Sequence, residues 1–577
     1  MDLKTRGVPP TDLERAAVDG VVGPQAARDL HDAGGGHELR GRRHLLLPAL
    51  HALNDRVGWI SQQAIDYVAE RLDISPAQIY GVASFYALFS LTERPTRQVH
   101  VCIDLACRSN GGPTQANLPN GVHGSPCLGL CERAPAAFVV DAGAENQQSV
   151  AGHVTSVQVR GWADGGHPGP EAERAAAVPQ AGDRSLVLLK RAGRVDPLDF
   201  DAYIADGGLK AIARARQLGP QGVIAAVTES GLTGRGGAGF PTGRKWEAVR
   251  TQPSTPRYLV CNADESEPGT FKDRVLIEND PLGLIEAMAI AAYATGCEYG
   301  FVYLRGEYRR AYDTLLSALA TSRRRGLLGG DTGFDIAVFK GAGAYICGEE
   351  TAIFNSIEGF RGEPRNKPPY PFEVGLFGQP TVVNNVETLI NVPSIVLDRV
   401  QANRRLFCVS GAVEVPGVYE VELGLTLGEL IGLAGGLRQG SELQAVLLGG
   451  AAGGFAGPDD LDLVLDQEST RAAGLTLGSG VVMVHDQSVD LVDQLTRIAA
   501  FFGDESCGQC VPCRVGTLRQ HEAIERLAAS SDGSDRSVDL ALVGDIGRAM
   551  TDASICGLGQ TAHSAIETAI VRLGVFS

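Results

Sequence analysis

The spacing of apolar residues predicts helices in the first part of the chain. Between residues 44 and 57 leucines and a valine recur every three or four positions, which places them on one face of a helix. The residues of this stripe are Leu47, Leu50, Leu53 and Val57. Two further helices are predicted to begin before residue 92, because Ser61 and Ser75-Pro76 each place a capping side chain before a helical pattern.

The pattern changes along the rest of the chain. Between 98 and 140, β-branched runs alternate with glycine-rich turns, which predicts a small α/β module, and a second α/β region runs from about 185 to 400. Its most apolar stretch, 287–304, is interrupted by Gly296 and Glu298, so it predicts a buried helix followed by a strand. Short strands and turns begin near 405, and helices return near 488.

These changes predict six segments, with an overall α/β multidomain fold. The segments are a loosely ordered polar extension (1–40), a helical lead-in with an α/β module (41–145), a linker rich in Gly, Ala, Glu, Pro and His (146–184), a larger α/β domain (185–402), a short-strand domain (403–487) and a helical domain (488–577).

Composition narrows the function. The chain has 577 residues and a net charge of −17, which argues against a nucleic-acid partner because phosphate binding needs a basic face. We expect a cytosolic protein, because the first twenty residues lack the apolar core of a secretory signal and no apolar run approaches the ~20 residues of a membrane span. In such a chain, twelve cysteines favour metal or redox chemistry over disulfides.

Eight cysteines form two sets of four. The first set is Cys102, Cys107, Cys127 and Cys131, and the second is Cys507, Cys510, Cys513 and Cys556. Four thiols can hold one iron–sulfur cluster, and three cysteines at three-residue intervals with a remote fourth favour a cubane over structural zinc. The spacing of the first set suits either zinc or an iron–sulfur cluster. The four single cysteines, Cys261, Cys297, Cys347 and Cys408, are predicted to be buried apolar residues.

Three loops could bind a nucleotide. Residues 231–240 are glycine-rich and precede Lys245, so backbone N–H groups and an ammonium could hold phosphates, although a purely structural turn fits as well. The loop fits a dinucleotide-binding fingerprint poorly, because that motif needs a strand before it and one acidic residue about 20 positions after it. Here Val223-Ile224 would have to form the strand, and a group of four residues with three acids follows at 264–267. Loops 341–350 and 380–388 add glycines, carboxylates and amides, and the combination fits a nucleotide-type cofactor.

Several long motifs resemble those of a known family. Segments 231–246, 261–269, 305–309, 341–351 and 505–514 resemble, in order, the flavin- and NADH-binding subunit of respiratory complex I and its soluble relatives. Segments 47–52, 80–86 and 127–135 resemble the small [2Fe–2S] subunit of the same module, with a shorter gap between Cys107 and Cys127.

The resemblance implies a fold and an activity. The fold would comprise a thioredoxin-like N-terminal domain, a Rossmann-like FMN/NAD domain, a β-grasp domain and a C-terminal helical bundle. A fusion of these parts looks most like the diaphorase subunit of NAD-reducing [NiFe]-hydrogenases. The flavin subunit of NAD-dependent molybdenum or tungsten formate dehydrogenases is the next resemblance, and an electron-bifurcating or complex I-type subunit would share the motifs.

The resemblance also implies cofactors, site residues and partners. FMN would be contacted by Gly234, Arg235, Gly236, Lys245, Asn262, Asp264, Gly348, Asn384, Asn385 and Thr388. NAD(H) would be held by Phe240, Glu267, Glu349, Glu350 and Tyr370, with Tyr345 also in the cofactor site and Glu267 and Glu350 orienting the hydride transfer. The first cysteine set would hold a [2Fe–2S] cluster and the second a [4Fe–4S] cluster. The partners would be a ferredoxin-like iron–sulfur subunit and a hydrogenase or formate dehydrogenase subunit.

Overall fold

The N-terminal segment is helical where it can be described. The computed structural model describes residues 7–23, 41–398, 401–530 and 535–576, and helix α1 (Asp12–Val22) lies in the first of these ranges. Thr11 and Glu14 form a capping box at its start, and Ala17, Val18 and Val22 are buried. The prediction of a loosely ordered extension is therefore wrong over 12–22, and its remainder at 1–6 and 24–40 lies outside the described residues.

The three predicted N-terminal helices are confirmed. They are α3 (Leu46–Val57), α4 (Gln62–Leu72) and α5 (Pro76–Ala83). Ser61 accepts a hydrogen bond from Ala64 N–H at 3.1 Å, and Ser75 accepts one from Gln78 N–H at 3.4 Å, as capping residues do. Helix α1 packs against α3 and α4, so the four helices form one small bundle.

A four-stranded mixed sheet follows this bundle. Its strands are β1 (Arg97–Cys102), β2 (Val122–Ser125), β3 (Ala136–Asp141) and β4 (Gln147–Gly152), in the order β2-β1-β3-β4. Helices α6 (Leu105–Ser109) and α7 (Ser156–Ala163) accompany it. The predicted linker is wrong over 147–163, because β4 pairs along the full length of β3 and Val159 and Trp162 of α7 are buried among the sheet's valines.

The large α/β domain is built on an all-parallel sheet with the order β7-β6-β5-β8. The strands are β5 (Tyr258–Ala263), β6 (Tyr299–Leu304), β7 (Asp335–Lys340) and β8 (Thr381–Asn385). Helix α12 (Pro281–Thr295) is buried almost all round and leads into β6, which confirms the helix-then-strand prediction. The other helices are α8 (Phe200–Ala205), α9 (Lys210–Glu229), α10 (Thr242–Arg250), α11 (Lys272–Asn279), α13 (Arg309–Arg324), α14 (Glu350–Ile357), α15 (Val386–Ile390) and α16 (Val392–Asp398).

A third sheet has a core of its own. Strands β9 (Arg404–Gly411), β10 (Gly417–Glu422), β11 (Leu443–Leu448), β12 (Gly454–Ala456) and β13 (Val481–Asp486) take the order β10-β9-β13-β11-β12. Helices α17 (Leu427–Leu433) and α18 (Gln467–Ala472) belong to this domain. Leu427 and Leu430 of α17 pack with Phe407, Val446 and Val484 of the sheet, which is the single-helix packing of a β-grasp domain.

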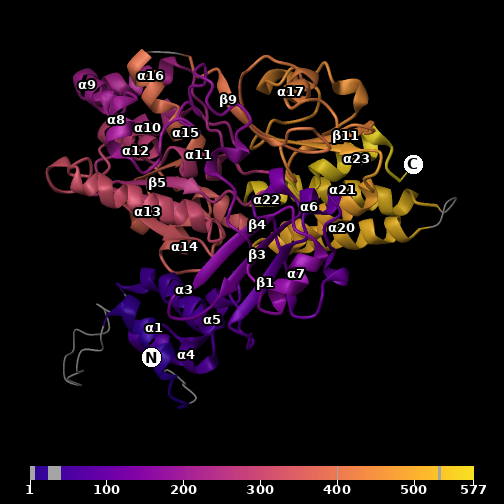
Figure 1. Ribbon diagram of the computed structural model, residues 1–577, viewed down its shortest axis with the longest axis horizontal. Coiled ribbons are helices and arrows are strands. Elements are labelled where there is room, and N and C mark those ends of the chain that lie inside the picture. Colours follow the sequence, from indigo (N-terminus) through magenta and orange to yellow (C-terminus); the bar gives the residue numbers. More distant parts are fainter. Residues whose placement is uncertain (1–6, 24–40, 399–400, 531–534, 577) are drawn as a thin grey trace.

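The C-terminal part is helical, as predicted. It consists of α19 (Leu491–Glu505), α20 (Val511–Ala529), α21 (Ser537–Ala553), α22 (Gly557–Thr561) and α23 (Ser564–Leu573). In Figure 1 these helices lie at the right, the third sheet above them, the parallel-sheet domain at the upper left and the N-terminal helices at the bottom. Helix α6 of the N-terminal sheet contacts both α19 and β9, so the N-terminal domain borders the helical domain and the third sheet.

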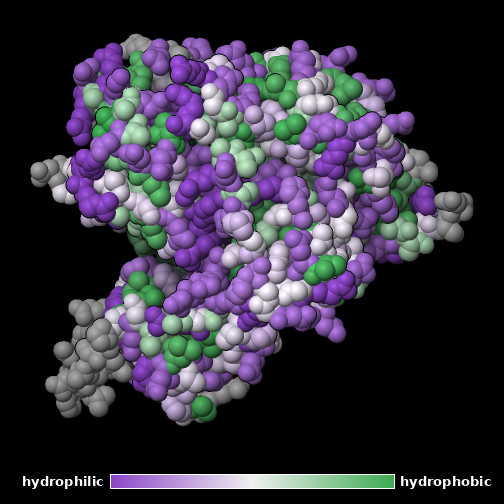
Figure 2. Space-filling model, viewed as in Figure 1, coloured by the Kyte–Doolittle hydropathy of each residue, from purple (hydrophilic) through white to green (hydrophobic). Residues whose placement is uncertain are grey.

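The face of the molecule seen in Figure 2 is mostly polar. Figure 2 shows apolar residues in small groups on a largely hydrophilic face. No helix in the described ranges is both long and apolar enough to cross a membrane.

Candidate functional site

The carboxyl ends of β5 and β8 meet at one edge of the parallel sheet. The two strands are neighbours, with Cys261 opposite Asn384 and Asn262 opposite Asn385. Asn262 Nδ2 donates to the Gly348 carbonyl at 2.8 Å, so the loop after β7 is tied to the same edge. Ligands of open α/β sheets bind at such edges, and three of the predicted cofactor segments converge here.

The glycine-rich loop covers this edge. It joins helix α9 to helix α10, and Val223 and Ile224 lie inside α9, so the strand of a dinucleotide fingerprint is absent here. The Arg235 backbone N–H donates to Thr388 Oγ1 at 2.9 Å, and a Cβ on Gly236 would lie 3.3 Å from the Asn385 Cβ. The loop backbone therefore lies directly on the segment that follows β8.

Arg235 contributes its backbone rather than its charge. Its guanidinium is buried and donates from Nη2 to the Ala402 carbonyl at 2.7 Å and to the Arg404 carbonyl at 3.3 Å. Desolvation lowers the pKa of this group. The side chain thus anchors the loop to the start of the β-grasp domain, away from the Gly236 side of the loop.

Two lysines and two glutamates form a charged group above the sheet edge. Lys245 Nζ lies 3.2 Å from Glu350 Oε2 and 3.2 Å from the Val383 carbonyl, and Lys367 Nζ lies 2.8 Å from Glu350 Oε1 and 3.0 Å from Glu349 Oε1. Burial raises the pKa of Glu350, but the charges of Lys245 and Lys367 outweigh it, so the pKa is lowered. Glu349 also caps α14 through the Thr351 and Ala352 N–H groups.

Asp264 presents a buried oxygen without a partner. Its Oδ1 accepts from the Ser266 hydroxyl at 3.2 Å, while Oδ2 has no hydrogen-bond partner. Burial raises its pKa well above the ordinary range. A Cβ on Gly348 would lie 3.9 Å from Oδ2, so the orphan oxygen faces a position without a side chain. A polar ligand that donates to this oxygen fits both features, and the site therefore suits the amides and hydroxyls of a flavin nucleotide.

Glu267 joins the parallel-sheet domain to the β-grasp domain. Its Oε1 accepts from Ala452 N–H at 2.9 Å and its Oε2 from the Ser479 hydroxyl at 2.8 Å. Burial raises its pKa to about 7, although both hydrogen bonds oppose the shift. Both carboxylate oxygens are therefore engaged by the neighbouring domain.

This burial predicts a pH-dependent stability. A pKa raised from 4.5 to about 7 contributes stability that is complete below pH 4.5 and lost as the pH rises through 7. The neutral Glu267→Gln variant should therefore gain about 2 kcal/mol relative to the parent chain between pH 5 and pH 8. Urea midpoints at the two pH values measure this gain, and the exposed Glu298→Gln variant is the control. An equal difference at both values would contradict it.

The predicted aromatic residues remain accessible. Phe240 is 50% and Tyr370 46% exposed, so each ring has exposed surface on which a ligand could stack. The Lys245 ammonium lies 5.9 Å from the Phe240 ring, and Tyr370 stacks on Phe372 at 5.6 Å. Asn384 is buried and accepts a hydrogen bond from Trp246 Nε1 at 2.8 Å, so it ties the end of β8 to helix α10.

A buried charged group behind Asn385 was not predicted from the sequence. Lys272 Nζ lies 2.9 Å from Asp273 Oδ1 and 3.1 Å from Glu387 Oε2, and Asn385 Nδ2 donates to Asp273 Oδ2 at 2.6 Å. Desolvation lowers the pKa of Lys272, but the two carboxylates outweigh it and the pKa is raised. Three charged residues in a row at 272–274, directly after an apolar Phe271, were the available signal.

The first cysteine set comes together in the structure. All four thiols are buried, and Cys127 Sγ lies 3.4 Å from Cys131 Sγ. The neighbouring thiols of Cys107 and Cys127, together with burial, raise the pKa of Cys102 well above its usual range. The Cys102 and Cys131 thiols lower the pKa of Cys127 well below its usual range, while the pKa of Cys131 is raised, so Cys127 is the sulfur favoured as a thiolate. Deprotonated sulfur is the form that ligates iron.

The second set lines one pocket. Cys507, Cys510, Cys513 and Cys556 surround it, together with Ile346 of the loop after β7 and Pro364. In the described ranges, no three or more His, Cys, Asp or Glu side chains are arranged around a single metal ion. Each set nevertheless brings together four cysteine sulfurs, which is the number and type of ligand that one iron–sulfur cluster needs. The iron atoms of such a cluster lie between the ligands, so the four sulfurs do not surround a single ion.

The loop after β7 borders both the sheet edge and the pocket lined by the second cysteine set. Gly348 accepts from Asn262 at the sheet edge, and Ile346 lines the cysteine pocket two residues earlier. Tyr345 donates its N–H to Glu505 Oε2 at 2.8 Å and packs its ring on Phe501 at 5.1 Å. The nucleotide-type site and the second cysteine set are thus separated by a few residues of this loop.

Family models match four parts of the chain. They are the Nuo51 FMN-binding domain (227–394), the NADH-ubiquinone oxidoreductase-F iron–sulfur binding region (493–573), the thioredoxin-like [2Fe–2S] ferredoxin (36–119) and the SLBB domain (406–456). The F-type subunit of the NADH-quinone oxidoreductase of Aquifex aeolicus is 42% identical over 401 residues, which are 67% of this chain and 92% of that one. The chain belongs to the family of these F-type subunits of NADH-quinone oxidoreductase.

Other members of this family extend the comparison. The NADP-reducing hydrogenase subunit HndC of Solidesulfovibrio fructosivorans is 39% identical over 66% of this chain and 80% of its own length. A chain in the crystal structure of the NAD⁺-reducing [NiFe]-hydrogenase in the H₂-reduced state matches with a TM-score of 0.76, 31% identity and 93% coverage of both chains. These findings confirm the predicted α/β multidomain fold, with its FMN-binding, [4Fe–4S] and thioredoxin-like [2Fe–2S] parts.

The thioredoxin-like match ends at residue 119, before Cys127 and Cys131. The structure nevertheless brings these two residues to Cys102 and Cys107, despite the shortened gap in sequence. Strand β2, at the edge of the sheet, lies within the shortened segment and delivers the chain to Cys127. The chain is an NAD-dependent flavin and iron–sulfur oxidoreductase subunit.

Proposed function

We propose that the chain is the diaphorase subunit of a NAD-reducing hydrogenase, exchanging electrons between NAD(H) and a [NiFe] partner through a flavin and two clusters. The observation that supports this choice is the share of this chain that aligns with each relative. The NAD⁺-reducing [NiFe]-hydrogenase chain aligns with 93% of this chain, whereas the Aquifex relative aligns with 67%. The unaligned remainder of this chain is shorter than its N-terminal domain, so the alignment with the [NiFe]-hydrogenase chain includes most of that domain.

The glycine loop and Lys245 would bind the phosphate of FMN. The exposed Gly236 backbone and the ammonium of Lys245 lie at the same sheet edge and supply the donors that a phosphate needs. Asp264 Oδ2 and the amides of Asn262, Asn384 and Asn385 would orient the rest of the flavin. FMN, when bound, supplies the exchange between a two-electron hydride donor and one-electron carriers.

The carboxylates would position NAD(H) rather than transfer protons. Glu350 and Glu349 are held by Lys245 and Lys367, so binding of a dinucleotide requires these ion pairs to be shared or exchanged. Their negative charge disfavours a 2′-phosphate, which favours NAD over NADP. Glu267, with a pKa of about 7, would fix the β-grasp side of the cleft, and the rings of Phe240 and Tyr370 would stack on the ligand.

The short loop after β7 would make the second cluster the next carrier. Tyr345 and Ile346 separate the flavin edge from the pocket of Cys507, Cys510, Cys513 and Cys556, and Glu505 fixes the loop through the Tyr345 N–H. The N-terminal cluster would lie next to Arg305, which follows β6 and donates to both the Cys127 carbonyl and the Glu265 carbonyl. A ferredoxin-like iron–sulfur subunit would carry electrons from this chain to the partner, and a cytosolic location accords with this assembly.

The partner is tested by purifying the tagged chain with its natural complex under anoxic conditions. We expect nickel in the complex, and NAD⁺ reduction that depends on H₂. Molybdenum or tungsten together with formate-dependent NAD⁺ reduction would replace the hydrogenase proposal by the formate dehydrogenase alternative. Reduction of both ferredoxin and NAD⁺, with neither nickel nor molybdenum, would favour an electron-bifurcating assembly.

A further inference from the structure

Three buried arginines from other domains hold the two segments that carry the first cysteine set. They are Arg274 of α11, Arg305 after β6 and Arg497 of α19. Arg274 and Arg305 are only 3% and 2% exposed. Their contacts with the cysteine segments lie about 140 to 390 residues away in sequence.

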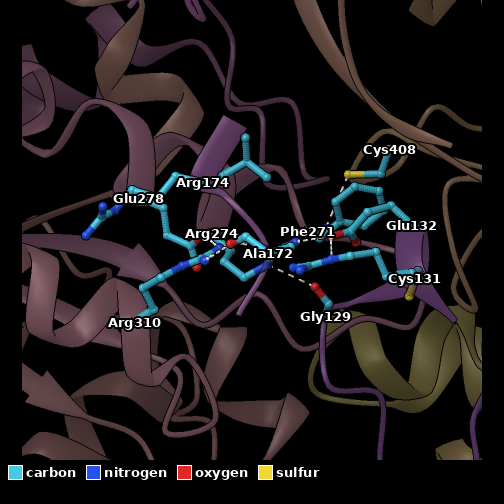
Figure 3. Close-up of polar contacts among 12 residues, drawn as sticks. Gly129, Cys131, Glu132, Ala172, Arg174, Phe271, Arg274, Glu278, Arg310 and Cys408 are labelled. Atoms are coloured by element: carbon cyan, nitrogen blue, oxygen red, sulfur yellow. Dashed lines mark hydrogen bonds and ion pairs between the residues drawn. The ribbon is translucent and has the colours of Figure 1, made fainter. Parts of the chain in front are cut away.

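The segment between Cys127 and Glu132 receives two of these side chains. Arg305 Nη2 donates to the Cys127 carbonyl, Arg274 Nε donates to the Gly129 carbonyl at 3.0 Å, and Arg274 Nη2 donates to Glu132 Oε1 at 2.7 Å. Figure 3 shows Arg274 lying between Glu278 on one side and Gly129 and Glu132 on the other. Two carbonyls and one carboxylate of this segment are thus fixed by the parallel-sheet domain.

The contact at Gly129 is close enough to require glycine. Its φ is +65°, and a Cβ at this position would lie 2.3 Å from the Tyr308 hydroxyl oxygen. Tyr308 in turn donates to Glu265 Oε2 at 3.1 Å. The segment between Cys127 and Glu132 therefore packs directly against the parallel-sheet domain, and a side chain at position 129 would clash with Tyr308.

The other cysteine segment is held through Asp104. Its Oδ1 accepts from Leu105 N–H at 2.9 Å, capping α6, and its Oδ2 accepts from Cys127 N–H at 3.2 Å. Arg497 Nε lies 3.4 Å from Asp104 Oδ1. The two segments are consequently linked to each other and to the helical domain.

We propose that Arg305 is a positioning residue for the N-terminal [2Fe–2S] cluster and, with its partner Glu307, sets the cluster's reduction potential from across the domain boundary. The inference rests on the proposed function, because it takes Cys102, Cys107, Cys127 and Cys131 as the cluster ligands. Arg305 contacts the backbone of the ligand Cys127, and Glu307 Oε1 lies 3.0 Å from its Nη2. Glu307 is 4% exposed and its Oε2 has no hydrogen-bond partner, so its charge is poorly screened.

The two charges act in opposite directions on the same equilibrium. Reduction adds one negative charge to the cluster, which a neighbouring guanidinium favours and a neighbouring carboxylate disfavours. Removal of Arg305 leaves the Glu307 carboxylate uncompensated, so the cluster becomes harder to reduce. Neutralising Glu307 leaves the guanidinium unopposed, so the cluster becomes easier to reduce.

The test is a redox titration of the [2Fe–2S] signal by electron paramagnetic resonance in the full chain. We expect Arg305→Gln to shift the reduction equilibrium on the order of tenfold toward the oxidised form, which is about 59 mV for a one-electron couple. Glu307→Gln should shift it by a similar factor toward the reduced form. Arg305→Lys keeps the charge and should stay within threefold of the parent chain.

A matched control separates this effect from general changes in charge. Arg323 lies on α13 and is paired with Asp335 on the surface, so Arg323→Gln should leave the potential unchanged. Glu307→Gln keeps the shape of the side chain and remains informative if Arg305→Gln fails to assemble the cluster. Shifts of the two variants in the same direction, or no shift in Glu307→Gln, would overturn the proposal.

The outcome in the parent chain separates this inference from the proposed function. If the parent chain shows no [2Fe–2S] signal after reduction, the ligand assignment fails and both proposals fall. If the signal is present and the variants do not shift it as stated, only the role of Arg305 and Glu307 is wrong.

Discussion

A Cys510→Ser variant loses the [4Fe–4S] cluster and with it four of the six iron atoms per chain, since one cluster holds four and the other two. Cys510 lines the pocket shared with Cys507, Cys513 and Cys556, and a serine oxygen is a poor substitute for a thiolate ligand. The proposed path from the nucleotide site leads through this pocket. We therefore expect NADH-dependent reduction of the natural partner to fall by about 100-fold or more.

Cys297→Ser is the matched control for this substitution. Cys297 is also a free cysteine, but it is buried between α12 and β6, just before the start of that strand, and accepts a hydrogen bond from the Thr295 hydroxyl at 3.1 Å. The control should keep all its iron and its electron transfer. Iron and acid-labile sulfide analysis measure the cluster content of both variants. Unchanged partner reduction by Cys510→Ser would contradict the assigned path.

A Gly236→Val variant should fold but bind FMN about 100-fold more weakly, a loss of about 2–3 kcal/mol. Gly236 lies exposed on the glycine loop, and a Cβ there would lie 3.3 Å from the Asn385 Cβ. A branched side chain would therefore stand between the loop backbone and the sheet edge, where the phosphate is expected. Flavin fluorescence quenching measures the dissociation constant.

Gly432→Ala provides the control for the loop. Gly432 lies in helix α17 of the β-grasp domain, and a Cβ there meets no atom within 4 Å. This variant should bind FMN as the parent chain does. If Gly236→Val also retained normal affinity, the glycine loop would be a structural turn, which was the alternative at the sequence level.

Local signals predicted much of the fold. Ser61 and Ser75-Pro76 mark helix starts because a cap acts within one turn, and the interruption by Gly296 separates α12 from β6 for the same local reason. Helix α1 was missed although Thr11 and Glu14 have the spacing of a capping box. The polar composition of the segment outweighed this short signal.

Elements that depend on distant contacts were not predictable in this way. Strand β4 was assigned to a linker because its segment is rich in Gly, Ala, Glu, Pro and His, and its pairing with β3 makes it a strand. Val223 and Ile224 are β-branched, yet they lie in α9, where their side chains are buried.

The candidate site shows the same division. Motif resemblance placed the residues of the glycine loop, the sheet edge and the cysteine sets, and the structure brings these segments together. The resemblance could not indicate that the Arg235 guanidinium points toward the Ala402 carbonyl, or that the Arg305 guanidinium contacts the Cys127 carbonyl. These contacts depend on how the domains pack, which residue spacing within one segment does not encode.

The most direct test of the account is an anoxic visible spectrum of the purified chain before and after NADH is added. The account predicts flavin bands and a broad iron–sulfur shoulder, both bleached by NADH, because the nucleotide site and the second cysteine pocket are separated only by the loop that carries Tyr345 and Ile346. A protein that stays colourless after reconstitution with FMN and iron, and that binds zinc instead, would contradict it.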